Sequence, residues 1–162
     1  MASLQRIRAF SRGGKRGLVA SALALVTLVL PSPVFAIDAG VIKVSSGDAG
    51  INRSGVRLAA RVGDKVQQTD VIVTGPDGAV GITFADDSRL SIGPNSVLAI
   101  DRFAFNSTTH AGTSETSLRK GTLAAVSGKL TRQSPDAMKV RTPATILGIR
   151  GTEFLVRAGE AE

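Results

Sequence analysis

Residues Thr142–Val156, with the sequence TPATILGIRGTEFLV, decide the fold because they predict two consecutive strands near the end of the chain. Pro143 opposes a helix and keeps Thr142 extended. Within residues 144–149, the even-numbered and the odd-numbered positions are both largely apolar. This pattern predicts a strand buried on both faces. Gly151 breaks the run. The alternating residues after it predict a second strand, and they are Thr152, Phe154 and Val156.

Arg150 is the only charged residue between Thr142 and Thr152. A charge in so apolar a run needs a partner or a route to solvent, and two interpretations stay open. In the first, the guanidinium satisfies loop carbonyls or an aspartate and clamps the last strand. In the second, it is exposed at the strand end and meets a carboxylate of a partner protein. The first interpretation predicts that replacing Arg150 by alanine lowers the melting temperature.

The chain after residue 36 is typical of an all-β protein. Gly and Pro punctuate it about every 8–12 residues, the spacing of a sandwich or barrel. Residues 114–126 are the best helical candidate, but Gly121 weakens it, and Lys120-Gly121 is expected to bend a strand instead. We predict one β-sandwich or roll of short antiparallel strands, with solenoid-like stacking as the alternative. The expected core residues are Phe84, Leu90, Ile92, Leu98, Ile100, Leu123, Ile146 and Phe154.

Two polar segments complete this prediction. After Phe105, Ala111 is the one apolar residue up to residue 114, and residues 105–114 are expected to form the longest exposed loop. Residues 129–136 are expected to form a polar connection that leads into the final strands.

Residues 1–36 have the pattern of a secretory signal peptide, expected to be helical. A basic segment precedes an unbroken apolar run over residues 18–30, prolines end the run, and the residues near Ala36 predict cleavage after it. An uncleaved anchor is the alternative, but spanning a bilayer needs about 20 apolar residues. The expected organisation is a signal peptide (1–36), a β domain (37–158) and a polar tail (159–162). The expected location is periplasmic or secreted, with no stable membrane span after cleavage.

Composition argues against several classes of function. Five basic and no acidic residues lie within residues 1–36, so the formal charge of +7 falls to about +2 for the rest of the chain. That balance, without Trp or Tyr, gives no basis for nucleic-acid binding. The chain has no cysteine and one histidine, His110, which excludes thiol chemistry and sites that need two histidines. We expect no catalytic residue, no cofactor and no metal, and we expect His110 to lie in a solvated loop.

Short turn and strand motifs follow one another in an informative order. They are Gly63-Asp64, residues 69–78 (TDVIVTGPDG), residues 84–90 (FADDSRL), residues 92–96 (IGPNS), residues 142–145 (TPAT) and residues 148–154 (GIRGTEF). Together they resemble the FecR domain, a periplasmic module, over about residues 41–156. The family usually has Asp-Gly-Ser where this chain has Asp86-Asp87-Ser88. Aspartate tolerates the left-handed region less well than glycine, so this turn is slightly costlier.

The resemblance implies a role in the bacterial envelope. Regulators of this family hold a sigma factor in the cytoplasm and contact the signalling domain of an outer-membrane receptor. We expect this chain to be a stand-alone secreted form that lacks the sigma-factor-binding and C-terminal regions. The expected function is that of a non-enzymatic protein-interaction or ligand-sensing module in envelope signalling. Its expected partner is an envelope protein, such as that signalling domain, or a glycan. A fragment or structural subunit of a larger secreted or cell-surface assembly is the alternative.

Two sets of residues stand out as candidate sites, and both are expected to be mainly structural. The turn motif comprises Asp77, Gly78, Asp86, Asp87, Ser88, Gly93, Pro94, Asn95 and Ser96, and the family motif comprises Thr142, Pro143, Gly148, Arg150, Gly151, Thr152 and Phe154. Turn residues of these types supply a positive or preset φ. Asp86 and Asp87 could offer oxygen ligands to calcium, but calcium needs about six to eight of them, so an ordinary turn is preferred.

Overall fold

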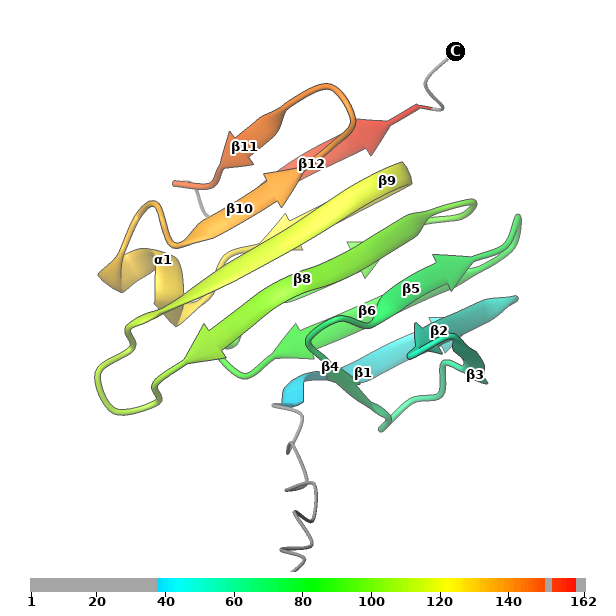
Figure 1. Ribbon diagram of the computed structural model, residues 1–162, viewed down its shortest axis with the longest axis horizontal. Helices are drawn as coiled ribbons and strands as arrows, with labels where there is room; N and C mark the ends of the chain where they lie inside the picture. Colours follow the sequence, from blue (N-terminus) through cyan, green and yellow to red (C-terminus); the bar gives the residue numbers. More distant parts are fainter. Residues whose placement is uncertain (1–37, 151–152, 160–162) are drawn as a thin grey trace, which may run out of the picture. The chain divides into compact units, whose positions relative to one another are not determined.

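The computed structural model describes residues 38–150 and 153–159, which belong to one compact unit (Figure 1). These residues form twelve strands and one short helix, so the predicted all-β class is confirmed. In chain order the elements are β1 (Asp38–Ser46), β2 (Ala49–Arg53), β3 (Val56–Ala59), β4 (Lys65–Gln67), β5 (Val71–Thr74), β6 (Ala79–Phe84), β7 (Arg89–Ile92), β8 (Val97–Phe105), β9 (Gly112–Val126), α1 (Lys129–Gln133), β10 (Met138–Arg141), β11 (Ile146–Gly148) and β12 (Glu153–Ala158). The predicted signal peptide, with its cleavage site at Ala36, lies outside the described residues, as do Gly151, Thr152 and residues 160–162.

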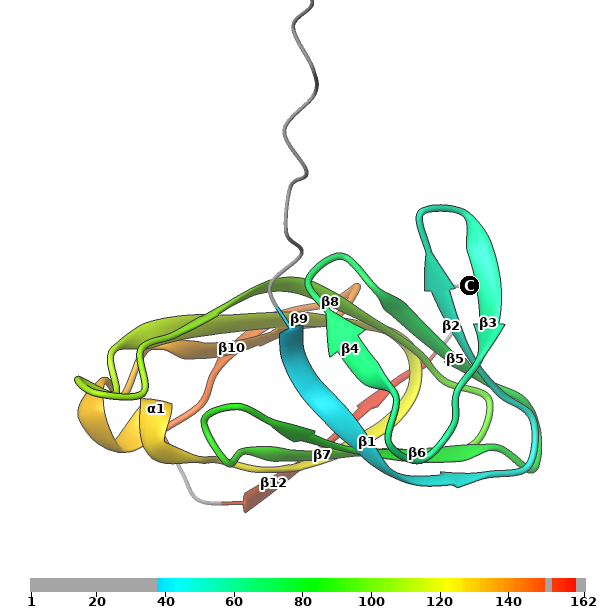
Figure 2. The same cartoon turned by 90° about the horizontal axis from the view of Figure 1, so that it is seen from below.

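The strands form a curled sheet whose two halves face each other as layers (Figure 2). One layer has the order β4-β1-β6-β7-β9-β12, and the other has the order β3-β2-β5-β8-β9-β10-β11. Every pairing is antiparallel except that of β9 with β10. The sandwich-or-roll prediction therefore describes the arrangement, because the two layers enclose one common core.

Strand β9 belongs to both layers. Its first half pairs with β8 and β10, and its second half pairs with β7 and β12. The change of layer occurs at Gly121, whose φ of +94° is a conformation that favours glycine. A Cβ atom at Gly121 would also overlap Ser96. The expected bend at Lys120-Gly121 is thus present, and residues 114–126 form a bent strand rather than a helix.

The core lies between the layers and contains most of the residues expected there. Six of the eight are buried, namely Phe84, Leu90, Ile92, Leu98, Ile100 and Leu123. Phe84 packs against Phe103, with the ring centroids 5.1 Å apart. Phe154 is half-buried and packs against this core from β12. The alternating strands around residues 80–100 fill the core because one face of each is apolar.

The prediction that residues 144–149 form a strand buried on both faces is wrong. Residues 142–145 form the loop of the β10–β11 hairpin, and β11 is a three-residue strand that pairs only with β10. Ile146, expected in the core, is 62% exposed. Only Ile149, just after β11, is buried. The run is apolar, but it lies at the edge of a layer, where β11 has no second neighbouring strand among the described residues.

The two polar segments also differ in detail from the prediction. Strands β8 and β9 extend into the expected loop, so that only residues 106–111 remain outside strands. His110 lies in that loop with φ +57°, and its ring stacks on Phe105 at a centroid distance of 6.0 Å. Residues 129–133 form helix α1, which buries Leu130 and Thr131. Five residues are too few to give a helical signal by periodicity.

Candidate functional site

The Gly93–Ser96 part of the turn motif joins three segments inside the fold. Ser96 is fully buried, and its N–H donates to Thr74 Oγ1 at 2.9 Å. Its Oγ accepts a hydrogen bond from the Thr122 N–H at 3.0 Å, beside the bend of β9. Thr74 Oγ1 in turn donates to the Gly93 carbonyl at 2.7 Å. These contacts fasten β5 and β9 to the β7–β8 turn, so this part of the motif is positioned to hold the layers together.

Beside these hydrogen bonds, other residues of the Gly75-Pro76 and Gly93-Pro94 turns also form contacts within the fold. Asn95 has φ +51°, and its N–H donates to the Gly75 carbonyl at 2.9 Å. The Pro94 carbonyl accepts from Ser96 Oγ at 3.0 Å. In the β5–β6 turn, Asp77 accepts from the Asp48 N–H, and Gly78 lies so close to Asp48 that a side chain would not fit.

The Asp86-Asp87-Ser88 turn between β6 and β7 uses its two carboxylates differently. Asp86 is buried and accepts hydrogen bonds from the Ser88 N–H and Ser88 Oγ, at 3.1 and 2.6 Å. Asp87 is exposed, has φ +66° and pairs with Lys129 Nζ at 2.7 Å. The hydrogen bond and charge of Lys129 lower the pKa of Asp87. Since the two carboxylates have separate partners, the geometry does not bring them together around an ion. Within residues 38–150 and 153–159, no group of three or more acidic or histidine side chains could hold a metal.

The described family-motif residues lie in and after the β10–β11 hairpin. Thr142 and Thr145 close its loop, because Thr142 N–H donates to the Thr145 carbonyl at 2.8 Å and Thr145 N–H donates to Thr142 Oγ1 at 3.1 Å. Pro143 is exposed at the tip, and Gly148 has open space around it. The motif therefore places an exposed hairpin, closed by hydrogen bonds, at one end of a layer.

Arg150 contacts an aspartate, as the first interpretation of this residue requires. Its Nε and Nη2 donate to Asp136 Oδ1 at 3.0 and 2.9 Å. Both side chains are more than two-thirds exposed, at 73% and 71%. The ion pair links residue 150 to the turn before β10, and an exposed pair of this kind contributes little stability.

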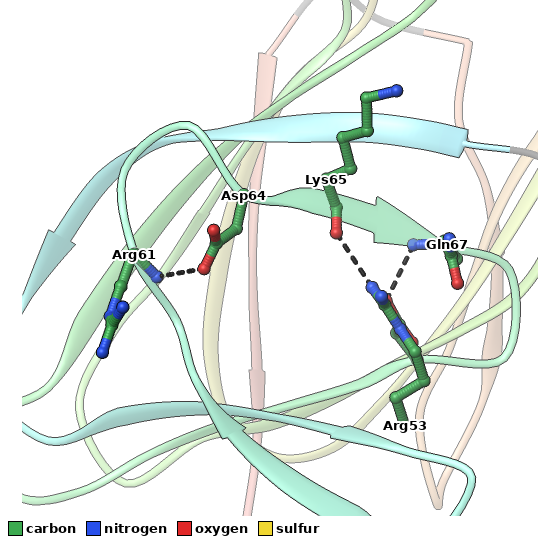
Figure 3. Close-up of polar contacts among 6 residues, drawn as sticks. Arg53, Arg61, Asp64, Lys65 and Gln67 are labelled. Carbon is green, nitrogen blue, oxygen red and sulfur yellow. Dashed lines mark hydrogen bonds and ion pairs between the residues drawn. The ribbon is translucent and has the colours of Figure 1, made fainter.

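A groove that sequence motifs did not indicate lies at the other end of the same layer. It has a volume of about 590 Å³ and is open to solvent. Its lining residues come from the β2–β3 hairpin and from the segment that leads into β4, and the polar ones are drawn in Figure 3. The lining residues are Ile51, Arg53, Leu58, Ala59, Arg61, Gly63, Asp64, Lys65 and Gln67. The lining thus combines apolar residues of the hairpin with three basic residues, Arg53, Arg61 and Lys65.

Arg53 is the anchored residue of this groove. Its Nε and Nη2 donate to the two carboxylate oxygens of Asp70 at 2.8 and 2.7 Å, and Nη2 also donates to the Lys65 carbonyl at 2.9 Å (Figure 3). Asp70 is fully buried and accepts a further bond from the Gln67 N–H at 2.7 Å. The Asp70 hydrogen bonds raise the pKa of Arg53 despite its partial burial. This bidentate pair holds the β2–β3 hairpin to the β4–β5 connection.

The other charged residues of the groove are more accessible. Asp64 accepts a hydrogen bond from the Arg61 N–H at 2.9 Å, while the Arg61 guanidinium has no ion-pair partner within the described part of the chain (Figure 3). Lys65 Nζ pairs with Asp38 at 2.6 Å on the exposed surface, and this contact lowers the pKa of Asp38. Arg61 is therefore the cation of the groove that has no ion-pair partner among the described residues, whereas the Lys65 side chain extends away from Arg53 to pair with Asp38 (Figure 3).

Strand β3 forms an open edge beside the groove. All four of its residues are exposed, and it pairs only with β2. Ala60 N–H donates to the Ala49 carbonyl at 3.0 Å, which fixes the alternation of bonds along the hairpin. By this alternation Leu58 and Val56 bond to β2, whereas the N–H and C=O groups of Arg57 and Ala59 point outward.

Sequence reasoning missed this groove for a physical reason. Its charged residues come from separate short segments, and their closeness depends on the hairpin folding back over β4. The available signals are Gly63-Asp64, which is among the motifs of the family resemblance, and the arginines at positions 53, 57 and 61. These arginines lie in β2, in β3 and after β3, and their spacing in the sequence does not reveal a groove.

Comparison with known families places most of these elements in one family. Residues 70–162, from the residue before β5 onward, match FecR, described as FecR protein. The match starts later than the predicted resemblance, so β1–β4 and the groove residues from 51 to 67 precede it. No curated protein and no solved structure matches the chain. No described helix has the length and apolar character needed to cross a membrane. The family is related to signalling in the bacterial envelope. Because the match covers more than half of the chain, the chain belongs to the FecR family.

Proposed function

We propose that this protein is a non-enzymatic interaction module of the bacterial envelope that binds an extended segment of a partner protein along β3. The observation that carries this proposal is the open edge of β3, where all four residues are exposed and the backbone groups of Arg57 and Ala59 point outward. An added strand satisfies such groups and extends the sheet. The FecR match supports the envelope and signalling context.

The groove beside the edge indicates what kind of segment fits. Alternation places Val56 and Leu58 on one face of β3 and Arg57 on the other, and Arg61 lines the groove after the strand. Successive side chains of a strand point to opposite faces, so a segment with alternating apolar and acidic residues would place each type where it is accommodated. The expected partner segment is therefore extended, apolar on one face and acidic on the other.

The groove is preformed, which favours binding. Arg53 and Asp70 fix the hairpin through a bidentate pair whose carboxylate is fully buried. A preorganised edge avoids part of the entropy cost of ordering on binding. A signalling segment could then bind without a rearrangement of the sheet.

The proposal is tested with two synthetic peptides, one of alternating valine and glutamate and one of alternating valine and lysine. Fluorescence anisotropy is expected to show binding of the acidic peptide alone. Ala59→Pro removes an outward N–H without touching the bonds to β2, and is expected to abolish that binding. Val44→Thr is the matched control, since Val44 is exposed on β1 away from the groove. Equal binding of both peptides, or unchanged binding by Ala59→Pro, would contradict the proposal.

A second arm identifies the source of the segment in cells. A photo-crosslinking residue at Leu58 is compared with the same residue at Val44, and both positions are exposed. A protein adduct formed at Leu58, absent at Val44 and lost in the Ala59→Pro background is the expected result. A glycan adduct at Leu58 would instead favour a carbohydrate ligand and overturn strand addition.

A further inference from the structure

Strand β12 forms the free edge of the other layer. Among the described strands it pairs with β9 alone, and its residues alternate between the core and solvent. Val156 and Ala158 are buried, whereas Glu153, Leu155 and Arg157 are exposed. Leu155 is 73% exposed, the highest value among the exposed large apolar residues of the described chain. A six-residue edge strand with an exposed leucine at its centre is an association site that natural proteins usually protect.

The three residues of β12 with exposed side chains also carry its unpaired backbone groups. Gly93 N–H donates to the carbonyl of Thr122, which lies opposite it, so Thr122 bonds toward β7. By alternation, Leu123 and Ala125 bond toward β12, where they face Val156 and Phe154. The N–H and C=O groups of Glu153, Leu155 and Arg157 consequently point to the free edge. Three residues thus present both their side chains and their backbone groups to solvent.

This edge is complementary to itself. When two copies of β12 lie antiparallel with Leu155 opposite Leu155, each Glu153 lies opposite an Arg157 of the other copy. All three opposed pairs are of the hydrogen-bonded type, because the outward groups belong to these residues. Oppositely charged and apolar cross-strand pairs both stabilise a sheet. Within the described residues, neither Glu153 nor Arg157 has an ion-pair partner in its own chain.

The other edge strands of the described chain lack this property. Strand β3 (VRLA) and strand β4 (KVQ) each carry a basic residue and no acidic one, and β11 (ILG) carries no charge. Antiparallel self-pairing of β3 or β4 would gain no ion pair between strands. Strand β12 is the one edge where both signs are placed symmetrically about an apolar residue.

We propose that a second copy of this chain binds along β12, forming a two-fold symmetric dimer in which the two β12-containing layers become one continuous sheet. Two-fold symmetry requires a self-complementary patch, and β12 provides one. Because a single strand pair is a small contact, the dimer is expected to depend on protein concentration. The β3 edge stays open in this dimer, so partner binding and dimerisation occur at different edges.

Sedimentation equilibrium of the full chain tests this proposal. Glu153→Arg and Arg157→Glu each place like charges opposite one another and are expected to weaken the dimer by about tenfold or more. The double variant Glu153→Arg/Arg157→Glu restores the opposite pairing with the charges exchanged. It is expected to return the dimer dissociation constant to within about threefold of the original value. This ratio corresponds to less free energy than one typical hydrogen bond contributes. A monomer at all concentrations, or a double variant that is no better than the single ones, would overturn the proposal.

Two further variants distinguish a loss of pairing through β12 from a general loss of folding. Leu155→Pro removes an outward N–H and is expected to give a monomer, with circular dichroism showing that the sheet is kept. Because the chain has no cysteine, Leu155→Cys provides a unique thiol at the proposed two-fold axis. A short thiol-reactive crosslinker is expected to join Leu155→Cys chains and not Val44→Cys chains, which carry the thiol at another exposed site. Equal crosslinking of both variants would contradict pairing through β12.

Discussion

The groove beside β3 and the β10–β11 hairpin lie at opposite ends of one layer, and they hold their arginines in opposite ways. Arg53 is 30% exposed and binds both oxygens of a fully buried aspartate, while Arg150 and Asp136 are both largely solvated. Yet Arg150 belongs to the recognisable motif, and Arg53 lies before the FecR match. A motif that identifies a family need not be the part of the surface that has a prepared site.

The largest expected effect is a difference in the free energy of unfolding between alanine variants of a glycine at the β9 bend and of a glycine in the hairpin. Gly121→Ala is expected to destabilise the fold by about 3 kcal/mol, because a side chain is strained at φ +94° and would overlap Ser96. Gly148→Ala, in the family motif but in open space, is expected to cost less than about 1 kcal/mol. Urea unfolding measures both changes. A larger cost at Gly148 than at Gly121 would reverse the assignment of structural importance.

The next effect concerns the anchor of the groove. Asp70→Asn is expected to destabilise the fold by about 2–3 kcal/mol, because it breaks a buried ion pair whose arginine is partly solvated. Asp136→Asn, which breaks the exposed pair with Arg150, is the control and is expected to cost less than about 1 kcal/mol. Thermal unfolding of both variants would test this contrast. Equal losses of stability would show that the buried ion pair contributes no more than the exposed one.

Arg150→Ala addresses the interpretation of the hairpin directly. The melting temperature is expected to fall only slightly, because an exposed ion pair contributes less than about 1 kcal/mol. Calorimetry of this variant should be paired with recovery of bound proteins from envelope extract, because Arg150 lies at the opposite end of the layer from the β3 edge. If stability is unchanged and binding is lost, Arg150 meets a partner rather than clamping the last strand.

The smallest effects concern pH. Hydrogen bonds and charge from Lys65 and Lys129 lower the pKa values of Asp38 and Asp87 below their ordinary value of 3.8. A lowered pKa in the folded state means that each pair stabilises the protein above about pH 4 and that this contribution disappears as pH falls through the lowered pKa. Lys65→Met and Lys129→Met are therefore expected to be slightly less stable than the original at neutral pH and equally stable near pH 2. A difference in stability that persists at pH 2 would show that the lysines act through packing.

Sequence patterns predicted the all-β class and the bend of β9 because both depend on local properties. Gly121 interrupts a β-rich segment, and alternation around Leu90 and Leu98 identifies faces that become buried. Ile146 was misplaced because apolar character does not tell whether a strand is central or at an edge. The groove could not be predicted, since Arg53 and Lys65 meet only when the chain folds back over β4.

The sharing of β9 between layers has a consequence for the order of folding. Strands β7 and β8 both pair with β9, so neither has its full set of neighbours until residues up to about Val126 are available. Strand pairings that span long sequence separations form slowly, and unpaired edges invite aggregation in the meantime. A nascent or translocating chain that stops before Val126 would therefore be a substrate for chaperones and proteases. The arrival of β9 is the step that joins the earlier hairpins into one sheet, and β10 and β12 then pair with its remaining edges.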